Sequence, residues 1–385
     1  MLTVLHSEAS LGWGGQEIRI MAELTGLARR AHRTGLLAAP GAEILTRARA
    51  AAIPAWEVPF RHTLDVASAM RVARALREQA ADVLVTHSSK DGWVGGAAGL
   101  LAGVPVVRMR HLAVPVRSNP VSRLVYTRLC QRIVTTGEGG RDLLILAVRV
   151  PPERVVAVPT GVDLARFDPR RVDGRPVRQA LSIPQDAPVV GMVAVLRSKK
   201  GHRYFVEAAG EVVRAAPGAR FLIVGDGPMR AAVEEWIAKA GLAGCVFLLG
   251  HREDIPEVMA AMDVVVLPSR RDEGVPQVVG QALAMERAVV TTDVVGVTEL
   301  VEDGVTGVVV PPEDSQALAR AVIGLLKDRE RARAMGRAGA RRVADGFSLE
   351  KMLDRMEAIY GEVAAARAAA GAPAPPGQTR QAGAP

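Results

Sequence analysis

The sequence predicts an α/β protein made of two parallel-sheet domains in tandem. Short apolar runs rich in Val, Ile and Leu alternate with longer helix-like stretches along most of the chain, and this alternation is typical of βαβ units. The length of 385 residues exceeds that of one ordinary core and favours two domains of about 150–200 residues. A stretch rich in proline and charged residues interrupts the alternation near the middle of the chain and predicts a boundary there.

The first domain is expected over residues 1–167. Because crossovers between parallel strands are right-handed, its helices are expected to cover both faces of the sheet. The strand-like runs are 2–6, 34–38, 83–86, 104–107, 133–135 and 155–158, and the helix-like stretches between them include 16–30, 66–77 and 92–101.

A linker is expected over residues 168–188, where prolines and charges gather, and the second domain over residues 189–346. A C-terminal helix is expected over residues 347–370, with Ser348 as its cap, and the Ala-, Pro- and Gly-rich tail 371–385 is expected to be disordered. In the second domain the strand-like runs are 189–195, 221–224, 246–249, 264–267, 289–292 and 308–310, and the helix-like stretches include 202–215, 229–240, 276–285 and 315–326.

The net charge of +8 lies almost entirely in residues 1–165. A basic first half is typical of proteins with an anionic partner, such as a phosphorylated substrate, a membrane surface or nucleic acid. Aromatic residues make up only 3% of the chain, so no nucleic-acid partner is expected. A solvated, arginine-rich surface without any partner explains the charge equally well.

Several features of the sequence bear on its compartment. No apolar stretch reaches the roughly 20 residues that a bilayer-spanning helix needs, and no basic region precedes an apolar core at the N-terminus, as in a secretory signal. Cys130 and Cys245 are the two cysteines of the chain and are expected to be reduced thiols. We therefore expect a cytoplasmic protein, and the basic first half leaves open a peripheral place on the inner face of the cytoplasmic membrane.

Several common catalytic motifs do not occur in the sequence. Without a DxD, an HExxH or a Cys/His ligand set, no metal site is expected. Without a GxSxG elbow or a Walker GxxxxGK[ST] loop, neither a serine hydrolase nor a P-loop enzyme is expected. The glycines that follow predicted strands do not form GxGxxG, which disfavours a dehydrogenase.

In open α/β sheets, ligands bind where the carboxyl ends of strands lead into loops and helices. In the first half, Glu8 follows the first strand, and Gly14 and Gly15 open the next helix, where backbone N–H groups can approach a phosphate. Polar clusters after two further strands contain His87, Lys90, Arg110 and His111. An ordinary tight turn would explain the glycines as well, and a structural role would explain the histidines.

In the second half, Arg197 and Lys200 follow the first strand and suit a diphosphate, because arginine offers a fork and lysine a point charge. Gly225 follows the next strand. Glu273 stands just before a predicted helix and Gln281 lies eight positions later, so both side chains can reach one ligand. Each residue also has a structural explanation. Arg197 and Lys200 would lie in a solvated turn, Gly225 would serve packing, and Glu273 would cap a helix.

Together these residues resemble the retaining GT-B glycosyltransferases of family four, also called group 1. The clusters around His87 and Arg110 are similar to those of members that build cell-envelope saccharides such as lipopolysaccharide core. The likeness covers roughly residues 1–365 and rests on Gly14-Gly15-Gln16-Glu17, Val158-Pro159-Thr160-Gly161-Val162-Asp163 with Phe167, Lys200-Gly201, Val224-Gly225-Asp226-Gly227-Pro228, Leu267-Pro268-Ser269, Glu273-Gly274, Glu299-Leu300-Val301, Asp303-Gly304, Thr306-Gly307 and Val310-Pro311-Pro312.

The resemblance implies the GT-B architecture, in which two Rossmann-like domains face each other across a cleft and the C-terminal helix crosses back to the first domain. It also implies that the second domain holds a UDP- or GDP-sugar donor, that the first holds a saccharide or lipid-linked acceptor, and that there is no cofactor. The implied donor-binding residues are Gly14, Gly15, Arg197, Lys200, Gly225, Gly274, Val275, Pro276 and Gln281, the acceptor-binding residues are Glu8, His87, Lys90 and Arg110, and His111 and Glu273 lie at the reacting centre.

Two positions depart from the family pattern. Gln281 stands where the family's Glu-x7-Glu pattern has its second glutamate. A glutamine still hydrogen-bonds a ribose hydroxyl but carries no charge. The family's usual arginine aligns with Val195, so Arg197, two positions later, is assigned to the diphosphate by its proximity.

The resemblance implies transfer with retention, in which the leaving phosphate accepts the proton of the acceptor. This agrees with the lack of a glycosidase-like pair of acid and base residues, and fixed cations would make a metal ion unnecessary. Two alternatives remain: a GT-B-like sugar-nucleotide epimerase, and a non-catalytic nucleotide-sugar-binding protein, which Gln281 favours.

Overall fold

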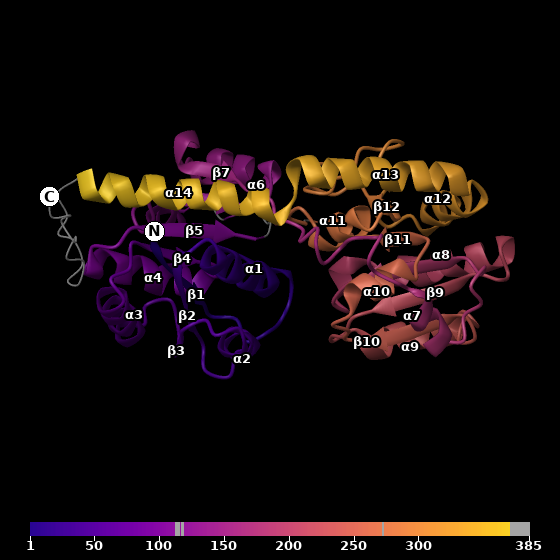
Figure 1. The fold of residues 1–385 in the computed structure, drawn as a ribbon, viewed down its shortest axis with the longest axis horizontal. Coiled ribbons are helices and arrows are strands. Elements are labelled where there is room, and N and C mark those ends of the chain that lie inside the picture. Colours follow the sequence, from indigo (N-terminus) through magenta and orange to yellow (C-terminus); the bar gives the residue numbers. More distant parts are fainter. Residues whose placement is uncertain (112–115, 117–118, 272, 370–385) are drawn as a thin grey trace, which may run out of the picture. The chain divides into compact units, whose positions relative to one another are not determined.

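The computed structural model describes residues 1–111, 116, 119–271 and 273–369. The chain divides into two compact units, each built on one parallel sheet (Figure 1). The first unit comprises Met1–Pro159 and the C-terminal segment that begins at Lys351, and the second comprises Thr160–Glu350. The predicted α/β class with two parallel sheets is therefore confirmed. The predicted tail 371–385 lies outside the described residues.

The sheet of the first unit has its strands in the order β3-β2-β1-β4-β5-β6-β7, all parallel. The chain adds β2 and β3 on one side of β1 and the strands from β4 onward on its other side, so the strand order changes direction between β1 and β4. Such a switch point is where open α/β sheets bind ligands. The strands are β1 (Thr3–Glu8), β2 (Arg33–Ala38), β3 (Ala55–Glu57), β4 (Val83–Thr86), β5 (Val106–Arg110), β6 (Arg132–Thr135) and β7 (Val155–Ala157).

Helices cover both faces of this sheet. Neighbouring residues of β2 point to opposite faces: Leu36 packs with Ile20 and Ile44 on one face, and Leu37 packs with Val72 and Val94 on the other. The helical elements are α1 (Gly15–Arg29), α2 (Glu43–Ala50), α3 (Val66–Glu78), α4 (Ser89–Ala102), α5 (Pro120–Thr127), α6 (Glu138–Leu143), the π-helical turn η1 (Leu144–Val148) and the 3-10 turn η2 (Pro152–Arg154).

The C-terminal helix α14 (Leu349–Ala369) belongs to the first unit from Lys351 onward. Its Leu353 lies directly over Gly26 of α1, where a Cβ atom would come within 2.5 Å of the leucine side chain. Met356 and Tyr360 of α14 are fully buried. Burial of these large side chains fixes the helix against α1, more than 320 residues earlier in the chain.

The sheet of the second unit has the order β10-β9-β8-β11-β12-β13 and is also parallel throughout, with its switch point between β8 and β11. Neighbouring residues of β8 alternate between two helix-covered faces, as Val189 and Val190 show. The elements are β8 (Val189–Val193), β9 (Arg220–Val224), β10 (Val246–Gly250), β11 (Val264–Leu267), β12 (Ala288–Thr292), β13 (Val308–Val310), α7 (Arg175–Ala180), the 3-10 turn η3 (Ser198–Lys200), α8 (His202–Ala215), α9 (Arg230–Lys239), α10 (Ile255–Ala260), α11 (Gln277–Ala284), α12 (Ser315–Lys327) and α13 (Arg329–Gly346).

The predicted domain end at residue 167 and the predicted linker 168–188 need correction. The division falls between Pro159 and Thr160, and the segment that follows is an integral part of the second unit. Within the segment 168–188, Val177 and Ile183 are buried in that unit's core. The segment is therefore packed structure and not a linker, because its few apolar side chains are buried although prolines and charged residues surround them in the sequence.

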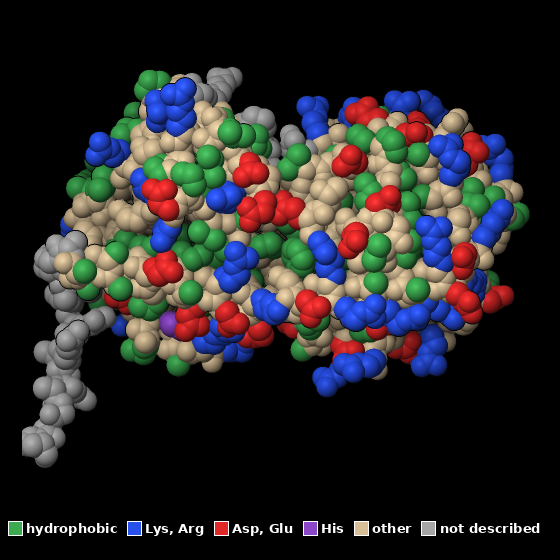
Figure 2. Space-filling model, turned by 90° about the horizontal axis from the view of Figure 1, so that it is seen from above, with side chains coloured by type: hydrophobic (Ala, Val, Ile, Leu, Met, Phe, Trp, Pro, Cys, Tyr) green, Lys and Arg blue, Asp and Glu red, His purple; other side chains and the backbone are tan. Residues whose placement is uncertain are grey.

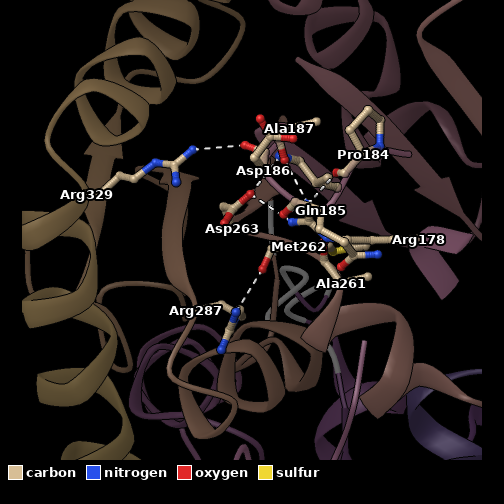
Figure 3. A network of polar contacts seen from close by, with 11 residues as sticks. Arg178, Pro184, Gln185, Asp186, Ala187, Ala261, Met262, Asp263, Arg287 and Arg329 are labelled. Atoms are coloured by element: carbon tan, nitrogen blue, oxygen red, sulfur yellow. Dashed lines mark hydrogen bonds and ion pairs between the residues drawn. The ribbon is translucent and has the colours of Figure 1, made fainter. Parts of the chain in front are cut away.

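The side chain of Arg178 on α7 connects the segment 168–188 to the sheet (Figure 3). Its guanidinium donates to the carbonyl oxygens of Ala187 at 2.8 Å and Ala261 at 2.9 Å, and it pairs with Asp263 at 3.1 Å. The Asp263 carboxylate also accepts the backbone N–H of Val189, the first residue of β8, at 2.8 Å. One buried arginine thus joins the segment to the amino ends of β8 and β11.

The surface shows acidic and basic side chains interspersed on the face drawn in Figure 2. Among the described residues, no helix combines the length and the apolar character needed to span a bilayer.

Candidate functional site

The candidate site of the second unit lies at the switch point between β8 and β11. Lys200 follows β8 in the turn η3, and Glu273 follows β11 just before α11. The two side chains meet, with Lys200 Nζ 2.7 Å from Glu273 Oε1. Ser269 also donates its hydroxyl to Glu273 Oε1, at 2.7 Å. Ser269 was not predicted as a site residue, although it directly follows the buried strand and Pro268.

Glu273 is 5% exposed, whereas the Lys200 side chain is 18% exposed. The Lys200 side chain is therefore the more accessible member of this ion pair, and the Glu273 carboxylate fixes the position of its ammonium group. A lysine held in this way is a pre-positioned cation for a phosphate oxygen.

Glycines allow three loops to pass close to one another beside this ion pair. Gly201 has φ +76, and a Cβ there would lie 1.8 Å from the Pro268 carbonyl oxygen. Gly225, directly after β9, has φ +135, and its Cβ would lie 2.1 Å from the Ala194 carbonyl oxygen. The loops after β8, β9 and β11 can therefore converge only if both positions lack a side chain.

We expect the substitution Gly225→Ala to destabilise the protein by at least about 1–3 kcal/mol, because it adds both a clash and a disfavoured φ. Chemical denaturation measures this loss. Gly210→Ala is a matched control, since Gly210 lies inside α8 and a Cβ added there would meet nothing within 4 Å, and alanine there should stabilise by about 0.5–1 kcal/mol. Equal effects of the two substitutions would contradict the close approach at Gly225.

The other predicted donor-side residues lie near this ion pair in the chain but differ in exposure. Arg197 is exposed, and its side chain has no hydrogen bond or ion pair among the described residues. Val275 and Pro276 are buried and Gln281 is half-buried on α11. Gly274 packs against Gly296, where a Cβ would lie 2.5 Å from the Gly274 carbonyl oxygen. The structure thus joins Lys200 to Glu273 and leaves Arg197 in solvent one turn earlier.

The candidate site of the first unit lies at the equivalent place, the carboxyl ends of β1, β4 and β5. His6 of β1, His87 after β4 and His111 after β5 are hydrogen-bonded in a row, with both N···N distances 2.9 Å. Asp91, at the start of α4, accepts the backbone N–H of His87 at 2.7 Å and the Ser7 hydroxyl at 3.0 Å. His87 and His111 were predicted as site residues from the sequence, whereas His6, which lies within a strand, was not.

Glu8, the last residue of β1, is fully buried. Its carboxyl group accepts the backbone N–H of Ser10 at 2.7 Å and a hydrogen bond from the Gln16 side chain. Burial, and next the nearby Asp91, raise the pKa of Glu8 from its ordinary value to about 8. A carboxyl group with such a pKa is protonated in much of the protein at neutral pH and can donate a hydrogen bond.

This pKa predicts a pH dependence of stability. Between pH 4.5 and 8 the folded protein keeps a proton on Glu8 that the unfolded chain releases, so this residue's contribution to the free energy of unfolding falls as the pH rises. Glu8→Gln should remove that fall, which is on the order of a few kcal/mol. Urea denaturation of both proteins at pH 5, 6.5 and 8 measures the difference. Parallel pH profiles would contradict the raised pKa.

The remaining residues predicted for the first unit lie around the same edge of its sheet. Lys90 is exposed in the first turn of α4. Arg110 donates to the Tyr126 hydroxyl at 2.9 Å and lines a cavity of about 450 Å³ between α4 and α5. Gly14 caps α1 and Gly15 is exposed at its first turn, so the N–H groups at this helix N-terminus are open to an anion.

Comparisons with known families cover both halves of the chain. The family model described as "Glycosyltransferase Family 4" matches residues 13–166, and the model described as "Glycosyl transferases group 1" matches residues 187–328.

Individual relatives match most of the chain. The UDP-Gal:alpha-D-GlcNAc-diphosphoundecaprenol alpha-1,3-galactosyltransferase of Escherichia coli is 28% identical over 308 residues, which are 77% of this chain and 79% of the relative. The D-inositol 3-phosphate glycosyltransferase of Geodermatophilus obscurus is 31% identical over 342 residues, 79% of this chain and 73% of the relative. Among solved structures, Anabaena HepE in complex with UDP and glucose matches with a TM-score of 0.83 at 21% identity, covering 94% of this chain and 100% of that one.

Proposed function

Because this chain belongs to the family 4, group 1 glycosyltransferases and has their GT-B fold, we propose that it transfers a sugar from a UDP- or GDP-sugar to a saccharide or lipid-linked acceptor of the cell envelope. The class of enzyme and the fold are those that the sequence predicted. The proposal adds the donor, the acceptor and the residues that handle them.

The observation that carries the donor assignment is the ion pair between Lys200 and Glu273. It lies at the switch point of the sheet, where α/β proteins bind nucleotides. Lys200 offers an accessible charge to the donor diphosphate, and Arg197, which is exposed on the same loop, adds a second cation. Glu273 positions Lys200 and lies beside the donor sugar, while Gln281 meets the ribose.

The charges support a chemical role for this lysine. When the bond between the anomeric carbon and the diphosphate breaks, its electron pair leaves with the nucleoside diphosphate, and a fixed cation stabilises the negative charge that develops there. The acceptor hydroxyl attacks the same face of the sugar and gives its proton to the leaving phosphate oxygen. The anomeric configuration is thereby retained, and no metal ion is required for the charge.

The first unit supplies the acceptor side of the proposal. A diphosphate-linked lipid, as in the name of the Escherichia coli relative, or a phosphorylated saccharide would suit its basic residues, among them Lys90 and Arg110. Glu8 and His87 are buried, so they support the surface of the acceptor site from beneath. His111 is half-buried at the same edge, and we assign it to the reacting centre.

A thermal-shift screen with UDP- and GDP-sugars, followed by a transfer assay, tests the proposal. One nucleotide class should raise the melting temperature, because a ligand that binds only the folded state stabilises it. That donor should then glycosylate a synthetic diphospholipid-linked N-acetylglucosamine or a saccharide acceptor in the presence of EDTA. Proton NMR of the product should show the anomeric configuration of the donor.

A different result would contradict each detail of the proposal. An inverted product would exclude retention, and loss of activity in EDTA that is restored by a divalent cation would exclude metal independence. An epimerised sugar nucleotide formed without any acceptor would favour the epimerase alternative. If no nucleotide sugar raises the melting temperature, the donor assignment fails.

A further inference from the structure

A cavity of about 380 Å³ lies within the second unit, at the amino ends of β11 and β12. Its lining includes Val264 and Ala288, the first residues of these two strands, together with residues of α12, α13 and the turn before β12. Lys200 and Glu273, by contrast, follow the carboxyl ends of strands of the same sheet. The cavity therefore lies at the opposite edge of the sheet from the candidate donor site, and a molecule bound there would be a second ligand.

Four arginines line this cavity. Arg329, Arg333 and Arg337 are exposed and follow one another at intervals of four residues on α13. The fourth, Arg287, lies half-buried in the turn before β12. Because residues at i and i+4 are neighbours on a helix surface, the three side chains of α13 form one cationic face about 12 Å long. Like charges at this spacing destabilise a helix, so an anion bound beside them would stabilise it.

The carboxylates of the cavity leave most of this positive charge uncompensated. Its described lining includes two of them, Asp263 and Glu286. Asp263 is already paired with Arg178, at 3.1 Å. Glu286 is exposed and forms no ion pair with any residue that the structure describes. Four guanidinium groups therefore meet one available carboxylate among the described lining residues.

These guanidinium groups also retain unused hydrogen-bond donors. Arg329 donates to the carbonyl oxygen of Asp186 at 3.3 Å (Figure 3). Arg287 donates to the carbonyl oxygens of Met262 at 3.0 Å and Met285 at 2.8 Å. The other two arginines of the cavity make no hydrogen bond or ion pair within the described part of the chain. Since a guanidinium has five N–H donors, all four groups can still bind an anion.

The pKa of Arg287 supports the same interpretation. Burial lowers this pKa from its ordinary value, although the nearby carboxylates of Asp263 and Glu286 act in the opposite direction. The protonated guanidinium has therefore lost water without gaining enough negative charge around it. An anion in the cavity would supply that charge.

The floor of the cavity is apolar. Val264, Ala288 and Leu325 line it and are each no more than 2% exposed. An apolar floor below exposed cations suits a small molecule with an anionic head and a less polar body. A carboxylate carries one negative charge, whereas a phosphate monoester carries about 1.5–2 near neutral pH and has three acceptor oxygens that match guanidinium forks.

We propose that this cavity binds a phosphate monoester, with Arg287, Arg333 and Arg337 contacting the phosphoryl oxygens and the apolar floor contacting the rest of the molecule. The site is a second ligand site of the chain and does not depend on the proposed function. A soluble phosphate ester and the headgroup of phosphatidic acid share this chemistry, and the experiments below separate them.

Calorimetric titration of the full chain with glycerol 3-phosphate tests the site, with glycerol at the same ionic strength as the ligand control. We expect saturable binding of the phosphate ester alone. The double substitution Arg333→Gln with Arg337→Gln should raise its Kd about 10-fold or more, because two charge-assisted donors are lost. Arg331→Gln with Arg341→Gln is the matched control and should bind like the wild type, since both residues are exposed on α13 and neither lines the cavity.

Arginine modification by phenylglyoxal, mapped by mass spectrometry of peptides, locates the site independently. Glycerol 3-phosphate should protect Arg333 and Arg337 and leave Arg331 and Arg341 reactive. Lys200→Met should keep both the affinity and the protection. Loss of binding in Lys200→Met would mean that the ester occupies the donor site, and would overturn the proposal.

Sedimentation with phosphatidylcholine vesicles that contain phosphatidic acid tests the lipid source. Binding to these vesicles that requires Arg333 and Arg337, without binding of glycerol 3-phosphate, would assign the cavity to a lipid headgroup. Binding of the soluble ester without vesicle binding would assign it to a small phosphorylated molecule. If neither probe binds, or if the two double variants lose binding equally, the arginines are only a solvated surface and the proposal is wrong.

Discussion

The substitution Lys200→Met should lower kcat/KM for sugar transfer by roughly 10²–10³, the loss typical of removing one pre-positioned group that stabilises a developing negative charge. Lys200 Nζ is held 2.7 Å from Glu273 Oε1, so its charge is fixed in position, whereas the nearby Arg197 side chain is exposed. Methionine keeps the length and apolar stem of lysine and removes only the charge. Steady-state kinetics with the identified donor measure the effect.

Lys239→Met is the matched control for this prediction. Lys239 lies on α9 and pairs with Glu235 at 2.5 Å, and its side chain is 73% exposed. The two variants lose the same charge, so a general electrostatic effect would reduce the activity of both. Equal rates for Lys200→Met and the wild type, measured well below their melting temperatures, would remove Lys200 from the donor site.

Arg19→Met should destabilise the first unit by about 3–5 kcal/mol, the usual effect of leaving one member of a buried ion pair without its partner. Arg19 is fully buried and pairs with Glu23, and its guanidinium also donates to the Val158 carbonyl oxygen at 2.7 Å. Chemical denaturation at pH 8 measures the loss. It should be smaller at pH 5, because Glu23, whose pKa is already raised by burial, can then take up a proton.

The double substitution Arg19→Met with Glu23→Gln should recover much of this stability, because no buried charge is left and the Tyr360 hydroxyl, which donates to Glu23, keeps an acceptor. An exposed pair serves as the control. Arg74 pairs with Glu78 on α3 with both side chains more than half exposed, so Arg74→Met should change stability little. A double variant as unstable as Arg19→Met alone would mean that the guanidinium acts through its bond to Val158 rather than through its charge.

The sequence was sufficient for the class of fold because strands such as β4, β11 and β12 are short runs rich in β-branched residues and are buried throughout. Such runs are typical of central parallel strands. The boundary between the two units was harder to predict, because α7 and the residues around it contain few apolar side chains among prolines and charged residues. The strand β3 is only three residues long, and α13 is dominated by arginine and alanine with a narrow apolar face, so neither gives a clear periodic signal.

Both candidate sites could be predicted in part, because polar residues after buried strands mark the carboxyl edge of a parallel sheet. The pairing of Lys200 with Glu273 required the strand order, in which β8 and β11 are neighbours although two strands separate them in sequence. The histidine row spans separations of 81 and 24 residues. His6 lies in the middle of β1, and no local pattern distinguishes a histidine there from one that merely packs.

Calorimetric titration with UDP or GDP, whichever raises the melting temperature, tests the central claim most directly. If Lys200 binds the diphosphate, the Kd of the protein for the nucleotide should be about 10-fold or more higher in Lys200→Met than in the wild type. This increase corresponds to the roughly 1.5–3 kcal/mol of a hydrogen bond to a charged group. Lys239→Met should bind like the wild type. Identical affinities for the wild type and Lys200→Met would show that the nucleotide binds elsewhere on the chain.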